Sequence, residues 1–166
     1  QATPGAIELI DWSSNNFSEL KEAIKNSDIV INLIGILYET RKQKFYNIHS
    51  SIPEAISKIC TETDVKKFIH VSAIGANENS KSLYQKSKYQ GEVKALNNFK
   101  NTVIIRPSVV CGTEDNFTNL FSKLSILPLI PVVGINYKFQ PILVTDVADA
   151  IVQAIETKGN EGKIYE

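Results

Sequence analysis

The chain has 166 residues, of which 43% are hydrophobic and 22% charged, and this composition excludes collagen-like repeats, coiled coil and disorder. The 18 Lys and Arg residues balance 18 Asp and Glu residues, which argues against a nucleic-acid partner, because phosphate contacts call for a basic excess. The two cysteines, Cys60 and Cys111, cannot form a disulfide framework, no Cys/His spacing is typical of a zinc site, and no apolar stretch approaches the roughly 20 residues of a transmembrane segment.

Strand-like and helix-like segments alternate through the first third of the chain. A short apolar run at residues 7–10 predicts a strand, and the helical spacing of apolar residues in 17–24 predicts a helix. Residues 29–34 are rich in β-branched side chains and are stopped by a glycine, as in a buried parallel strand. An apolar stripe over 45–59 predicts the next helix, and we expect Pro53 to kink it.

The same alternation continues to the C-terminus. Strands are predicted at residues 68–72, 103–106 and 142–144, with a helix over 82–98 between the first two. Asp146 is placed to cap a last helix that ends near residue 156. This pattern predicts an α/β fold, a doubly wound parallel sheet with helices on both faces, and no linker divides the chain into domains.

The sequence lacks the glycine-rich turn with which a dinucleotide fold normally begins. Only Gly159 and Gly162 have the inner spacing of that motif, and they follow a helix rather than a strand. In the strand order 3-2-1-4-5-6, the first two predicted strands would be strands 3 and 4. We therefore expect further residues upstream of Gln1 that supply the phosphate loop.

Tyr84 and Lys88 form a Tyr-x-x-x-Lys pair on the predicted helix, which places both side chains on one face. A tyrosine is a poor acid or base at neutral pH, and a neighbouring ammonium lowers its pKa. The same lysine can donate hydrogen bonds to the ribose hydroxyls of a nucleotide. The alternative is a coincidental spacing, since lysine is abundant here.

Six segments carry a resemblance to a known family, and they occur in the family's order. Together they resemble the extended short-chain dehydrogenase/reductases, a superfamily with a Rossmann-type fold. Residues 52–56, 68–72 and 115–117 resemble more narrowly the atypical branch that contains the Rossmann-type accessory subunit of respiratory complex I (NADH:ubiquinone oxidoreductase) and its bacterial relatives. The six segments are residues 10–12, 28–35, 68–72, 84–92, 106–112 and 141–148.

The resemblance implies binding of NADP or NAD. It places Asp11 and Trp12 at the adenine, although Asp11 could instead cap a turn, and it makes Tyr84 and Lys88 the catalytic pair. The glycine in the ribose-binding segment lets the chain approach a ligand closely, or serves only as a turn residue. The implied cofactor-binding residues are Asp11, Trp12, Leu33, Ile34, Gly35, Lys88, Pro107, Ser108 and Val110.

The sequence also departs from the family pattern. Ile74 stands where the family has its catalytic serine, and Ser72 lies two residues earlier on the same strand face, from which it could reach the nicotinamide. We include Ser72 with Tyr84 and Lys88 as a catalytic candidate. His49 falls where many members have a helix asparagine, and it is either a proton carrier or a structural residue.

These features predict a single NAD(P)-binding Rossmann-type domain over residues 1–166, incomplete at both ends and carrying the start of a small C-terminal substrate lobe. The favoured function is that of an atypical short-chain dehydrogenase/reductase similar to the complex I accessory subunit, whose nucleotide is mainly structural or sensing. The alternatives are an active oxidoreductase or epimerase acting on a nucleotide sugar, a quinone precursor or another small carbonyl compound, and a nucleotide-free scaffold.

The favoured function implies complex I subunits or a membrane-associated partner. The expected location is a bacterial cytoplasm or the mitochondrial matrix, at the inner membrane surface. The apolar run over residues 124–134 forms either the core of the small lobe or a patch against a membrane-associated partner or quinone.

Overall fold

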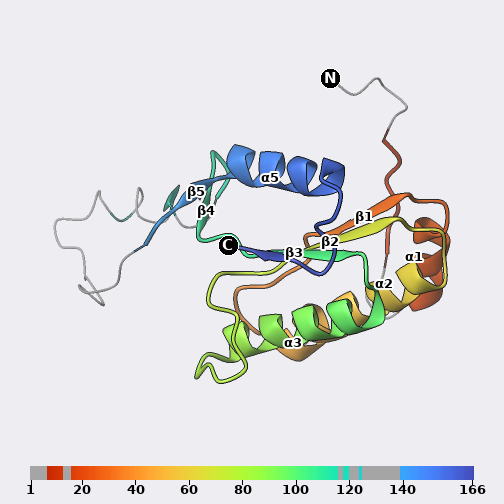
Figure 1. Cartoon of the computed structure of the whole chain (residues 1–166). Coiled ribbons are helices and arrows are strands. Elements are labelled where there is room, and N and C mark those ends of the chain that lie inside the picture. Colours follow the sequence, from red (N-terminus) through yellow and green to blue (C-terminus); the bar gives the residue numbers. More distant parts are fainter. Residues whose placement is uncertain (1–6, 13–15, 116–117, 120–123, 125–138) are drawn as a thin grey trace.

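The main sheet contains four parallel strands in the order β1-β2-β3-β6. A computed structural model of the chain describes residues 7–12, 16–115, 118–119, 124 and 139–166 (Figure 1). The β-branched and aromatic side chains of the two central strands are buried, as expected for a parallel sheet that is covered on both faces. The strands are β1 (Ile29–Asn32), β2 (Lys67–Val71), β3 (Thr102–Ile105) and β6 (Ile164–Tyr165).

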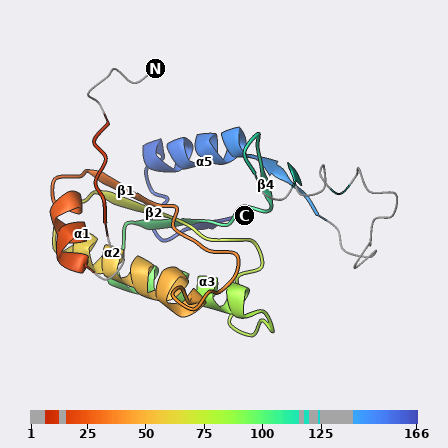
Figure 2. The ribbon, with the colours of Figure 1, turned by 180° about the vertical axis from the view of Figure 1, so that it is seen from behind.

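Helices cover both faces of this sheet (Figures 1 and 2). On one face lie α1 (Phe17–Ile24), α2 (Ile52–Thr61) and α3 (Leu83–Asn98), and on the other lies α5 (Val144–Glu156). The side chains of Asn16 and Ser82 accept hydrogen bonds from the first turns of α1 and α3, so both helices begin where polar caps stand in the sequence. The predicted doubly wound α/β fold is confirmed.

The helical stripe over residues 45–59 forms two joined helices instead of one kinked helix. A π-helix, η1 (Tyr46–Ser51), runs directly into α2, and Pro53 occupies the first turn of α2. Proline has no amide donor and its ring clashes with the carbonyl four residues earlier, so the regular α-helical hydrogen bonding is interrupted before Pro53. The apolar residues of the stripe still share one face, and Ile48, Ile52, Ile56 and Ile59 are all buried.

The predicted strand at residues 7–10 is wrong. Residues 7–12 form no strand pairing and residues 7–11 are exposed, and within the described ranges β1 has a neighbour on one edge alone. A strand needs a partner for its backbone N–H and C=O groups, and none of the described residues pairs with this segment. The opening segment does not pair with β1, and the predicted order of the strands that precede β1 stays a prediction.

Two short strands form a second parallel sheet beside the main one. They are β4 (Val110–Cys111) and β5 (Ile142–Leu143), and α5 begins immediately after β5. Asp146 therefore lies inside the first turn of α5 instead of at its cap, where it still interacts favourably with the helix dipole. Of the apolar run over residues 124–134, only Leu124 lies within the described residues.

A buried ion pair ties α3 to the end of β3. The carboxylate of Glu92, which is 1% exposed, accepts two hydrogen bonds from Arg106, at 3.0 Å from Nε and 2.7 Å from Nη2. Arg106 also contacts Glu166 at 2.7 Å, just after β6. This bidentate geometry fixes the helix to the sheet next to the Pro107–Ser108 loop.

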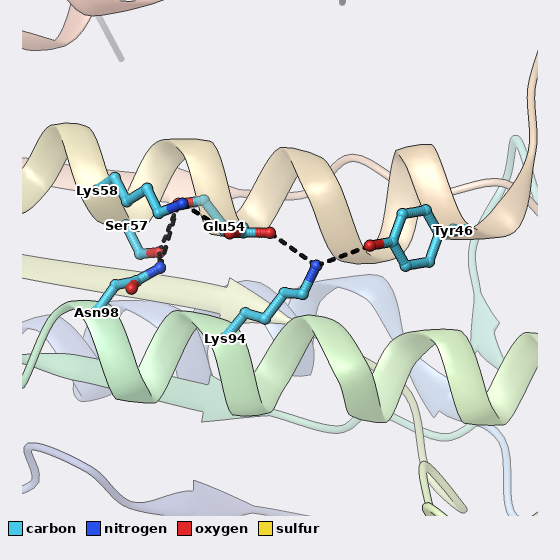
Figure 3. A network of polar contacts seen from close by, with 6 residues as sticks. All are labelled: Tyr46, Glu54, Ser57, Lys58, Lys94 and Asn98. Carbon is cyan, nitrogen blue, oxygen red and sulfur yellow. Dashed lines mark hydrogen bonds and ion pairs between the residues drawn. The ribbon is translucent and has the colours of Figure 1, made fainter.

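A second, solvent-side network joins η1 and α2 to α3 (Figure 3). Lys94 of α3 contacts Glu54 of α2 at 2.7 Å, and its ammonium also donates to the Tyr46 hydroxyl at 3.3 Å. Lys58 pairs with the other oxygen of Glu54. These contacts hold η1 and α2 against α3 on the solvent side, while the buried apolar stripe packs on the side of the core.

Candidate functional site

A cleft of about 560 Å³ opens at the carboxyl ends of the main strands. Its walls are the loops that follow β1, β2 and β3, together with one face of α3. Ligands of open α/β sheets bind at this edge, since the loops and helix N-termini converge there. The lining residues are Leu33, Gly35, Ile36, Leu37, Val71, Ser72, Ala73, Ile74, Tyr84, Lys88, Pro107, Ser108, Val109 and Val110.

The structure brings eight of the eleven predicted site residues together in this cleft. The three that do not line it are Asp11, Trp12 and Ile34. Their eight companions come from four separate parts of the sequence, so the convergence is produced by the fold and not by sequence proximity. The eight are Leu33, Gly35, Ser72, Tyr84, Lys88, Pro107, Ser108 and Val110.

Trp12 and Asp11 lie on the unpaired opening segment. The indole of Trp12 donates to the carbonyl of Asn16 at 2.7 Å and packs against the apolar core next to α1. Asp11 is exposed. Without a strand at residues 7–10, nothing fixes these side chains near the cleft, and their role at an adenine remains a prediction.

Lys88 is the charged group of the cleft, and it is almost completely buried. Its side chain lies on α3, the residue is 4% exposed, and its ammonium donates to the carbonyl of Val71 at 3.0 Å. Within the described part of the chain, this is its one hydrogen bond, although an ammonium has three donors. Burial lowers the pKa of Lys88 to about 8, partly opposed by the charge of Glu92. Lys88 is therefore charged at pH 7, with donors to spare.

Tyr84 lies one helical turn before Lys88 and lines the same cleft. Its ring contacts two other rings edge-on, those of Phe45 and His49, at centroid distances of 5.8 and 5.2 Å. Burial raises the pKa of Tyr84, whereas the sequence analysis expected Lys88 to lower it. The expectation is wrong for the protein alone because desolvation disfavours the phenolate and the Lys88 ammonium is directed at the Val71 carbonyl.

The hydroxyl of Ser72 is buried in the cleft wall and has no hydrogen-bond partner among the described residues. A buried hydroxyl without a partner is costly, and such groups mark sites where a ligand or water supplies the missing bond. Ile74, two residues further on, is 50% exposed at the cleft and offers no hydroxyl. The cleft therefore offers the ammonium of Lys88 and the unpartnered hydroxyl of Ser72 as buried polar groups.

Several lining residues were not singled out in the sequence. Ile36, Leu37, Val71, Ala73 and Val109 all form part of the cleft. Each adjoins or follows a predicted strand end, and this position was the signal that could have identified them.

Among the described helices, none has the length and hydrophobicity of a membrane-spanning segment.

Comparison with known proteins gives several relatives of the same kind. The chain is 35% identical over 163 residues, 97% of its length, to "NADH dehydrogenase [ubiquinone] 1 alpha subcomplex subunit 9, mitochondrial" of Mus musculus. It is 36% identical, over 98% of its length, to the protein of the same name in Dictyostelium discoideum. The chain is a homologue of these complex I subunits. It spans 43% and 45% of their lengths.

Solved structures of enzymes in complex with NAD or NADP share the fold of the chain. The whole chain superposes on a solved structure of dTDP-4-dehydrorhamnose reductase from Bacillus anthracis, in complex with NADP, with a TM-score of 0.76, and it covers 68% of that protein. Sequence identity is 16%, so this likeness concerns the fold. No protein-family model matches the sequence. The resemblance to an atypical short-chain dehydrogenase/reductase similar to a complex I accessory subunit is confirmed.

Proposed function

We propose that the cleft binds the nicotinamide and adjoining ribose of NAD or NADP, and that the chain serves in an accessory subunit of respiratory complex I. The observation that carries the proposal is the buried ammonium of Lys88, which has spare donors in the same cleft that the unpartnered hydroxyl of Ser72 lines. Ribose hydroxyls and a carboxamide supply the oxygen acceptors that such donors require. The homology to complex I subunits supports the choice of complex.

The residues present fit this nucleotide. Lys88 would hold the ribose hydroxyls, the backbone at Gly35 would let the ribose approach, and Pro107, Ser108 and Val110 would line the nicotinamide. The bound nucleotide would supply a hydride donor or acceptor. The pyrophosphate needs another segment, and the open edge of β1 is where a parallel strand and its phosphate-binding turn would fit.

We further propose that the nucleotide is mainly structural or sensing. Ile74 offers no hydrogen bond to a substrate carbonyl, and burial raises the pKa of Tyr84 away from the range useful for acid–base chemistry. In this role the chain would act at complex I in the mitochondrion, or at the cytoplasmic side of a bacterial complex. Either location places it at the surface of a membrane.

Replacing Lys88 with methionine should abolish nucleotide retention. The substitution keeps the length of the side chain but removes the donors, and we expect affinity for NAD or NADP to fall about 100-fold, as for the loss of a charged hydrogen-bond pair. The measurement is the nucleotide released from denatured, purified full-length protein, followed by calorimetric titration.

Two variants control this experiment. Lys86→Met changes an exposed lysine of the same helix and should leave the affinity unchanged. Tyr84→Phe should retain nucleotide and assembly, whereas an active oxidoreductase would lose turnover. Undiminished binding by Lys88→Met would refute the proposed site.

Binding should also weaken as the pH rises through about 8. Above its pKa of about 8, Lys88 loses the charge that strengthens its hydrogen bonds to the ribose. The neighbouring rings do not titrate there, because the pKa of His49 is lowered to about 4 and that of Tyr84 is raised. Calorimetric titrations between pH 6.5 and 9.5 would show the decline in the wild type but not in Lys88→Met.

The stability of the ligand-free protein should respond to the same group with the opposite sign. Unfolded lysine holds its proton up to about pH 10.4, so between about 8 and 10 the unfolded state binds more protons than the folded state. The contribution of Lys88 to stability therefore rises with pH over this window. A binding affinity that rises together with stability would contradict the assignment.

A further inference from the structure

His49 contacts two elements that line the cleft, the loop after β1 and helix α3. It belongs to η1 and is 1% exposed. Its ring stacks on Phe45 at a centroid distance of 5.3 Å and meets the Tyr84 ring edge-on at 5.2 Å. A side chain packed between rings in this way has one orientation, and its hydrogen bonds are therefore directional.

The hydrogen bonds of His49 define its tautomer. The backbone amide of Ile36 can only donate, and it lies 3.0 Å from Nε2, so Nε2 is the acceptor. Burial and the charge of Lys88 lower the pKa of His49 to about 4, which leaves the ring neutral at pH 7. The ring proton is therefore on Nδ1, where Ser87 Oγ accepts it at 2.9 Å.

The chain of hydrogen bonds continues into α3. The hydroxyl of Ser87 donates to the carbonyl of Tyr84 at 2.7 Å. The loop after β1 is thus connected through His49 and Ser87 to the helical turn that carries Tyr84. Every polar atom of the imidazole is used, so His49 is engaged as a connector and is not available as a proton carrier.

The hydrogen bond between His49 and the Ile36 amide lies close to the ammonium of Lys88. A Cβ built on Gly35 would lie 3.7 Å from His49 Nε2 and 3.8 Å from Lys88 Nζ. The wall formed by Gly35 and Ile36 therefore faces Lys88 across a distance of a few ångströms. A small movement of this wall changes the room beside the ammonium.

We propose that His49 is a positioning residue of the nucleotide site: through its bond to the Ile36 amide it holds the Gly35–Ile36 wall against α3 and so sets the shape of the pocket beside Lys88. The inference rests on the proposed function of the cleft. It differs from a general stabilising role because it depends on one hydrogen bond, the one that Nε2 accepts.

Two substitutions distinguish the hydrogen-bonding roles of Nδ1 and Nε2 of His49. In His49→Gln, the terminal amide reaches the place of Nε2 and its oxygen can accept from Ile36. In His49→Asn, the shorter amide reaches only the place of Nδ1 and leaves the Ile36 amide without an acceptor. We expect His49→Gln to bind NAD or NADP within about threefold of the wild type, and His49→Asn to bind about tenfold more weakly.

The measurements are made on the full-length protein. Nitrogen-detected NMR of the imidazole should show the Nδ1–H tautomer at pH 7, and hydrogen exchange at the Ile36 amide should be slow in the wild type and His49→Gln but fast in His49→Asn. Lys94→Met serves as the control, because it breaks the outer link between η1 and α3 without touching the wall (Figure 3). It should lower the melting temperature and leave the affinity unchanged.

An Nε2–H tautomer, or equal affinities of the two His49 variants, would overturn the proposal. So would a loss of affinity in Lys94→Met equal to that in His49→Asn, since that result would indicate a stability effect. If the wild type binds no dinucleotide, the proposed function fails, while the exchange of the Ile36 amide still decides whether His49 holds the wall.

Discussion

Replacing Gly91 with alanine should destabilise the protein by about 3 kcal/mol, although the same substitution in an exposed helix stabilises by about 1 kcal/mol. A Cβ on Gly91 would lie 1.9 Å from the carbonyl oxygen of His49 and 3.4 Å from the ring of Pro53. The first of these atoms is backbone, so no side-chain rotation relieves the overlap. Helix α3 would have to move away from η1, and urea unfolding would measure the cost.

The control for this substitution is Gly35→Ala. There the nearest atoms to a new Cβ lie at 3.7 and 3.8 Å, an ordinary van der Waals distance. We expect this variant to unfold at nearly the same urea concentration as the wild type. If Gly91→Ala were as stable as Gly35→Ala, the close approach of α3 to η1 would be wrong.

Lys67→Met should cost about 3 kcal/mol, because a buried lysine here closes the end of α5. The ammonium of Lys67 lies within 3.0 Å of four oxygens: three are carbonyls of Ala154, Ile155 and Thr157, and the fourth is the side-chain oxygen of Asn160. Its charge also complements the negative end of the helix dipole. Methionine preserves the packing of the stem and leaves these oxygens without the donor.

The neighbouring Lys66 provides a matched control. Its side chain is 74% exposed and pairs with Asp28 at the surface. Exposed ion pairs contribute little to stability, so Lys66→Met should leave the melting temperature nearly unchanged. Equal melting temperatures for the two variants would show that Lys67 does not secure α5.

Much of the fold could be predicted from local patterns. A helix was predicted over residues 82–98 and a strand at residues 68–72, and α3 and β2 match them within one residue. The one-residue shift of β2 has a physical reason. Lys67 looks like a surface residue in the sequence, but its backbone pairs with Ile29 of β1 and its ammonium is buried against the carbonyl of Thr157, 90 positions away.

The candidate site was predictable to the extent that it depends on strand ends. Gly35 and Pro107 follow predicted strands and Ser72 ends one, and a parallel sheet brings such positions to one edge. The pKa of Tyr84 could not be predicted in the same way. It depends on burial against Phe45 and His49, which the helical spacing of Tyr84 and Lys88 does not reveal.

The role of His49 also lay beyond the sequence. Its position suggested a proton carrier or a structural residue, and the choice needed the directions of its two hydrogen bonds. The predicted strand at residues 7–10 was wrong for a different reason. Its apolar run has the composition of a strand, but a strand forms only where another strand satisfies its backbone.

The unpaired edge of β1 affects whether the isolated chain associates with other peptides. Among the strands that the structure describes, none covers this side of Ile29–Asn32, and Ile31 is exposed beside it. Open peptide groups next to apolar side chains are a template for strand addition by foreign peptides or by further copies. Shielding this edge is therefore a condition for keeping the polypeptide dispersed, separate from anything the cleft binds.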